Sequence, residues 1–75
     1  MMEKEWSKQA TNMIKAELSR KGVTYDQLQE KMAVLGIEET ANAINVKINR
    51  GTFSFVFFMQ VMKAIGAKTL RLEDE

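Results

Sequence analysis

The sequence predicts an all-α fold, a small bundle of four to five helices, from the positions of its glycines and the spacing of its apolar residues. Glycine closes a helix readily because it adopts the left-handed backbone conformation at little cost. Four stretches with helical apolar spacing each end in a glycine, and these glycines lie 14, 15 and 15 residues apart. They are Gly22, Gly36, Gly51 and Gly66. We therefore expect four short helices within a single domain over residues 1–75.

The first helix is expected to end at Gly22 and to bury one apolar stripe, because its apolar residues recur at helical spacing. The stripe consists of Trp6, Ala10, Met13, Ile14 and Leu18. Trp6 is expected in the core, where it would tie the first helix to the fourth.

Thr24 is expected to cap the second helix, because its hydroxyl can accept from the amide of Gln27 while the Gln27 side chain reaches back to the cap amide. The helix then ends at Gly36. Its buried stripe is expected to be Leu28, Met32 and Leu35.

The third helix is expected to begin near residues 38–40, because Glu38 and Glu39 favour a helix N-terminus, and to run to Asn49 or Arg50. Its buried side is Ala41, Ile44, Ile48 and, in part, Asn45. The other side carries side-chain amides and cations, namely Asn42, Lys47, Asn49 and Arg50, together with Ala43 and Val46.

The fourth helix is expected to begin after Ser54, a good N-cap residue, and to end at Gly66. Its predicted buried face is Phe55, Phe58, Met59, Met62 and Ile65, widened by Val61. A helix that is apolar over more than half its circumference is either central to the core or covered by a partner. The alternation over residues 69–73 predicts a short C-terminal strand or a docked tail.

Composition excludes several classes of function. The chain has no Cys and no His, so we expect no disulfide, no metal, no cofactor and no enzymatic activity. No apolar run approaches the roughly 18 residues of a membrane span, and the polar N-terminus lacks the features of a signal peptide, so we expect a cytoplasmic protein. The net charge is +1, and residues 1–72 carry eleven cations against seven carboxylates, which permits nucleic-acid binding.

Several runs of the sequence resemble the lambda-repressor-like helix-turn-helix fold of the Xre/Cro regulators, over residues 15–72. The runs are Gly22-Val23-Thr24-Tyr25-Asp26-Gln27-Leu28, Gly36-Ile37, Ile44 to Gly51 ending in Asn-Arg-Gly, and Ser54 leading to Ala64-Ile65-Gly66. The whole chain is also similar to a family of short bacterial domains of unknown function, with the same Val-Thr/Ser-Tyr opening and Asn-Arg-Gly-x-Phe-Ser-Phe run.

The helix-turn-helix resemblance implies a DNA-binding protein, a transcriptional regulator whose third helix reads the major groove of double-stranded DNA. It implies base-reading roles for Asn42, Asn45, Val46 and Lys47. It implies phosphate contacts for Thr24, Gln27, Asn49 and Arg50. The residues also allow other interpretations: Thr24 and Gln27 can be a capping box, Lys47 and Arg50 can complement the helix dipole, and Asn45 can satisfy buried backbone.

Two features depart from the helix-turn-helix pattern. The distance from Leu28 to Gly36 is longer than usual in these regulators, and Glu38 and Glu39 make residues 38–51 neutral overall. An alternative function is therefore a protein-interaction or homodimerisation module that keeps the frame without binding DNA. In either case we expect a homodimer built from the fourth helix or from residues 69–72.

Overall fold

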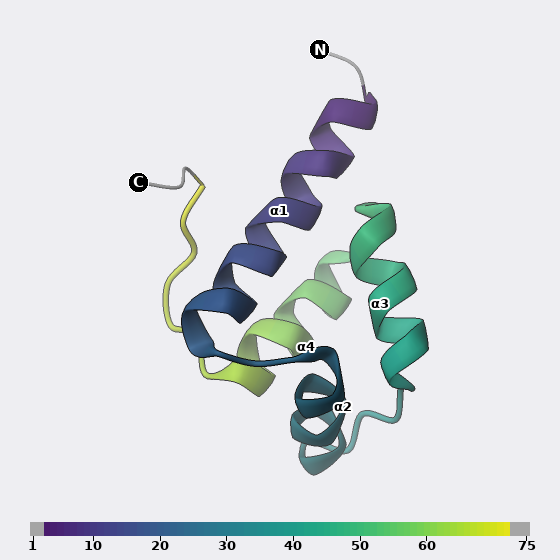
Figure 1. The fold of residues 1–75 in the computed structure, drawn as a ribbon, viewed down its shortest axis with the longest axis vertical. Coiled ribbons are helices and arrows are strands. Elements are labelled where there is room, and N and C mark those ends of the chain that lie inside the picture. Colours follow the sequence, from purple (N-terminus) through teal and green to yellow (C-terminus); the bar gives the residue numbers. More distant parts are fainter. Residues whose placement is uncertain (1–2, 73–75) are drawn as a thin grey trace.

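Four α-helices make up the regular structure of the computed structural model, which describes residues 3–72 (Figure 1). Their bounds are α1 Glu3–Lys21, α2 Tyr25–Val34, α3 Ala41–Arg50 and α4 Phe55–Ile65. The prediction of an all-α fold is confirmed, with four helices between residues 3 and 72. Each of the four glycines that were expected to end a helix has a positive φ, between 65° and 83°.

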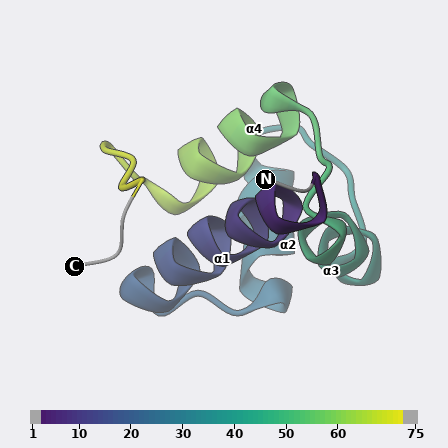
Figure 2. The ribbon, with the colours of Figure 1, turned by 90° about the horizontal axis from the view of Figure 1, so that it is seen from above.

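The helices cross one another around one core. In Figures 1 and 2, α1 and α4 run in similar directions, α2 crosses beneath them and α3 stands at one side. α3 packs against α1 and α2, and α2 packs against α4. The first turns of α1 extend beyond the other helices (Figure 1).

The core is built from residues spaced four apart on every helix, so that one narrow stripe of each helix faces inward. The buried apolar residues are Ile14 and Leu18 on α1, Leu28 and Met32 on α2, Ile44 and Ile48 on α3, and Phe57, Val61 and Ile65 on α4. The centres of the stripes predicted for the first three helices are confirmed.

The ends of the predicted stripes differ from the structure. Trp6, in the first turns of α1, is 57% exposed rather than in the core. Leu35 is also exposed, since it follows the last residue of α2 and no longer shares the helical stripe. Asn45 is exposed as well.

The predicted buried face of the fourth helix is confirmed at Val61 and Ile65 and wrong at Phe55 and Met59. Phe57 and Val61 lie at its centre, whereas Phe55 is 71% exposed and Met59 is 45% exposed. Nearly every position of α4 is apolar, so the spacing could not show which side packs against α2. Phe53, Phe58 and Met62 are partly buried around the core.

The predicted start of the third helix is also corrected. The N-cap is Thr40, whose hydroxyl accepts a hydrogen bond from the Ala43 amide at 3.0 Å, so Glu38 and Glu39 precede the helix. The short Thr40 side chain can satisfy a free amide of the first turn from the N-cap position, where threonine is a preferred residue. The predicted caps Thr24 and Ser54 are confirmed.

The segment that follows α4 is irregular rather than a strand over residues 67–72. A strand needs a neighbour to complete its hydrogen bonds, and the described residues contain no second extended segment paired with it. Leu72 is 77% exposed, so the predicted alternation does not dock this segment through its leucines. Residue 73, the last of the predicted strand, lies outside the described residues.

A tight junction joins α1 to the end of α3. The buried Thr11 hydroxyl donates a hydrogen bond to the Ile48 carbonyl at 2.6 Å. Gly51, with φ 70°, closes α3 directly against this point, and a Cβ there would collide with the Ser7 carbonyl and lie 2.9 Å from the Thr11 hydroxyl. Gly51 is therefore required both by its backbone conformation and by the close approach of α1.

We predict that Gly51→Ala destabilises the fold more than Gly66→Ala. Both glycines close a helix in the left-handed region, where an alanine costs about 1–2 kcal/mol. A Cβ at Gly66 meets nothing within 4 Å, whereas one at Gly51 meets backbone and adds roughly 2 kcal/mol of overpacking. Urea denaturation of the two variants measures the difference, and equal losses would contradict the assigned packing.

Candidate nucleic-acid interface

One face of α3 carries a continuous polar stripe. Asn42, Asn45, Val46 and Asn49 follow the i, i+3, i+4, i+7 spacing that places residues on one side of a helix, and all four are exposed. Ile44 and Ile48, on the core side, are fully buried. Three of the predicted base-reading residues and one predicted phosphate contact thus share a single outward face, which we call the asparagine stripe.

The asparagine stripe is internally hydrogen-bonded. The Asn49 side-chain amide donates to the Asn45 carbonyl at 2.9 Å and to the Asn45 Oδ1 at 2.5 Å. The Asn45 side chain is exposed, and its Oδ1 accepts from Asn49. It therefore does not have the role of satisfying buried backbone that the sequence also allowed.

A contact between helices brings the start of α2 to this stripe. The Asn49 Nδ2 lies 3.5 Å from the Tyr25 hydroxyl, at the limit of a hydrogen bond. Tyr25 is the first residue of α2, so the predicted phosphate contacts Thr24 and Gln27 belong to the helix turn that adjoins the asparagine stripe.

Thr24 and Gln27 form the predicted capping box. The Thr24 hydroxyl accepts from the Gln27 amide at 3.2 Å, and the Gln27 Oε1 accepts from the Thr24 amide at 2.9 Å. Both side chains remain exposed. The capping interpretation is confirmed, and the phosphate contact stays a prediction that these exposed groups allow.

Lys47 lies apart from the asparagine stripe. Its ammonium forms an ion pair with Glu39 at 2.6 Å and sits 5.2 Å from the centre of the Phe57 ring. The Lys47 ammonium is therefore positioned by two elements, the loop before α3 through Glu39 and the first turn of α4 through Phe57. The structure separates Lys47 from Asn42, Asn45 and Val46, with which the sequence grouped it.

A shallow hollow follows the end of α3. Its volume is about 220 Å³, and its lining combines two cations, two hydroxyls and two aromatic rings. The residues are Lys47, Arg50, Thr52, Phe53, Ser54 and Phe57. The hollow lies where Ser54 caps α4, so amide groups of the first helical turn also favour an anion there. The sequence predicted Arg50 here but missed Thr52, whose only sequence signal is its place two residues after Arg50.

Other kinds of site have less support within residues 3–72. This part of the chain contains no group of three His, Cys, Asp or Glu side chains that could hold a metal ion. None of its helices has the length and apolar character needed to cross a bilayer.

The chain is thus a small all-α domain. Its third helix buries one side and presents a polar stripe on the other. A family model described as a domain of unknown function (DUF6471) matches residues 6–70. The chain belongs to this family. The expected likeness to short domains of unknown function is thereby confirmed, and the likeness to helix-turn-helix regulators stays a prediction. No match was found with any curated protein or solved structure.

We predict that Asn45→Ala raises the free energy of unfolding by about 0.5 kcal/mol, because asparagine is a poor helix former at an exposed interior position. Asn12→Ala, at an exposed position in the middle of α1, is the matched control and should give a similar gain. Thermal denaturation measures both. A loss of stability for Asn45→Ala alone would give this amide a structural role and remove the reason to regard it as a recognition group.

Proposed function

We propose that this protein is a cytoplasmic DNA-binding protein, a transcriptional regulator in which α2 and α3 act as a helix-turn-helix and α3 enters the major groove. The observation that carries the proposal is the asparagine stripe. Amide side chains at four-residue and three-residue spacing can meet successive base edges when a helix lies in the groove.

The chemistry of the stripe favours A·T base pairs. Asparagine can donate to N7 and accept from N6 of adenine, and the Val46 side chain can contact the methyl group of thymine. Each well-formed amide pair contributes about 1–3 kcal/mol of discrimination against a wrong base. Asn42 and Asn45 are the residues we assign to this role.

Phosphate contacts would flank the stripe on two sides. Arg50, with the hydroxyls of Thr52 and Ser54, offers an anion site after α3, and the exposed Thr24 and Gln27 offer another at the start of α2. Asn49 lies between these groups through its contact with Tyr25. Lys47 would join them most effectively where a phosphate displaces Glu39, because the ion pair offsets the charge of its ammonium.

A second function is favoured by the exposed side of α4. Phe55, Val56 and Met59 are 71%, 63% and 45% exposed, and such a grouping is typical of protein interfaces. The chain would then be a protein-interaction or homodimerisation module. The same face can also serve the DNA-binding function, because a homodimer on a two-fold site gains affinity that one recognition helix lacks.

We expect a labelled sample, titrated with a mixed-sequence duplex at low salt, to show NMR amide shifts confined to residues 24–29 and 40–54. Non-specific affinity for DNA is typically about 10⁻⁴ to 10⁻⁶ M, which this measurement detects. Raising the salt should weaken the shifts, because phosphate contacts release counterions.

The same samples separate the two functions. If the duplex causes no amide shifts at low salt, the DNA proposal is overturned. Concentration-dependent shifts at Phe55, Val56 and Met59 without DNA would then support the interaction module instead.

We predict that Glu39→Gln strengthens DNA binding severalfold, because it frees Lys47 for a phosphate. The slope of the logarithm of the binding constant against the logarithm of salt concentration should steepen by about one unit. Glu30→Gln is the control, since it removes one exposed carboxylate from the side of α2 opposite Leu28 and Met32. The gain should vanish when Lys47→Ala is added to Glu39→Gln. A gain that survives this addition would show that Glu39 acts only by repulsion.

A further inference from the structure

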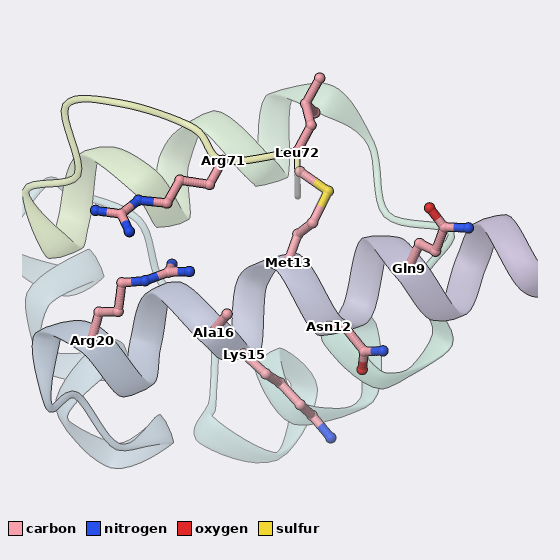
Figure 3. A pocket seen from close by; sticks show the side chains of 8 residues that line it. All are labelled: Gln9, Asn12, Met13, Lys15, Ala16, Arg20, Arg71 and Leu72. Atoms are coloured by element: carbon pink, nitrogen blue, oxygen red, sulfur yellow. The ribbon is translucent and has the colours of Figure 1, made fainter. Parts of the chain in front are cut away.

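A cleft between α1 and the segment that follows α4 lies outside the proposed DNA interface (Figure 3). Its volume is about 510 Å³, and small-molecule sites typically have volumes of about 300–1,000 Å³. The middle of α1 forms one wall, and Arg71 and Leu72 form the other.

The cleft has two chemically different ends. Figure 3 shows the Met13 side chain extending toward Leu72 at one end, with Ala16 in the wall between the ends. At the other end, Arg20 on α1 and Arg71 on the opposite wall extend their guanidinium groups into the same region. An amphipathic molecule would match this division, with an apolar body at one end and an anionic group at the other.

Positive charge is concentrated at the cationic end. Arg20 and Arg71 also line a neighbouring hollow of about 200 Å³, together with Lys21 and Lys68. Lys15 also lines the cleft, but its side chain extends away from both guanidinium groups (Figure 3).

The opposing negative charge in these walls is small. Among the described residues that line the two hollows, Glu17 is the single carboxylate, and Arg20 already binds it at 2.6 Å. A cleft lined by one sign of charge focuses its field and attracts the opposite ion.

We propose that this cleft binds small carboxylic acids that have an apolar body. The carboxylate would pair with the exposed Arg71, because a guanidinium matches the two oxygens of a carboxylate in a planar pair of hydrogen bonds. Arg20, whose guanidinium also binds Glu17, would add positive charge beside it. The apolar body would lie along Met13, Ala16 and Leu72. The site does not depend on DNA binding, since none of its residues belongs to the proposed DNA interface.

The chain itself carries the same chemistry close by. Residues 73–75 are Glu-Asp-Glu and follow Leu72 directly in the sequence. A variant that ends at Leu72 therefore distinguishes carboxylates of the chain from those of a free ligand.

The test is an NMR titration of the full chain with octanoate. We expect saturable amide shifts confined to residues 9–20 and 67–72. Acetate, which has only the head group, and octanamide, which has only a neutral head, should each bind at least tenfold more weakly.

Variants test the assigned contacts. Arg71→Gln should weaken octanoate binding at least tenfold, while Lys31→Gln, an exposed lysine of α2 that lines neither hollow, should leave it unchanged. Arg71 is exposed, so its replacement should leave the remaining amide spectrum intact. The variant that ends at Leu72 should bind octanoate at least as tightly as the full chain.

Four results would overturn the proposal. These are shifts that do not saturate, shifts centred on the exposed apolar face of α4, equal binding of octanamide and octanoate, or equal weakening by Arg71→Gln and Lys31→Gln. None of these results bears on the duplex titration, so this proposal and the DNA proposal can fail separately.

Discussion

The close approach of α1 to the end of α3 is the constraint on which the rest of the structure depends. The buried Thr11 hydroxyl binds the Ile48 carbonyl, and Gly51 turns the chain where there is no space for a side chain. This junction sets the direction of α3 and the point from which the chain enters α4. The outward face of α3 is therefore positioned mainly by contacts on its opposite side, and Asn42, Asn45 and Val46 remain exposed.

Charge is distributed unevenly around this frame. Near α3, Glu39 forms an ion pair with Lys47, so one of the two cations of this helix is already neutralised. On the other side of α1, the segment after α4 brings Arg71 to Arg20, and Glu17, which binds Arg20, is the single carboxylate among the described residues that line the two hollows there. α3 and this segment lie on opposite sides of α1 in Figures 1 and 2. Within residues 3–72, a group of cations is thus gathered near the end of α1 and the segment after α4, while the paired cation and carboxylate near α3 offset each other.

The candidate site could be predicted in part. The exposed stripe on α3 follows from helical spacing alone, because buried Ile44 and Ile48 fix which side faces out. The ion pair between Glu39 and Lys47 could not be predicted, since it depends on Glu39 lying in the loop before Thr40 rather than in the helix. Thr52 and Ser54 join Arg50 only through the fold of the loop around Gly51. The basic cleft joins parts of the chain far apart in sequence, so no local pattern indicated it.

The sequence by itself determined where α2 and α4 begin and where all four helices end, because capping hydroxyls and left-handed glycines act within a few residues of the chain. Thr24, Ser54 and the four glycines show this directly. Only the tertiary structure decided which side of α4 is buried, that Trp6 projects from the core, and that residues 67–72 form no strand. These outcomes depend on which other element lies opposite, and an evenly apolar helix or a lone extended segment carries no local signal of its neighbour.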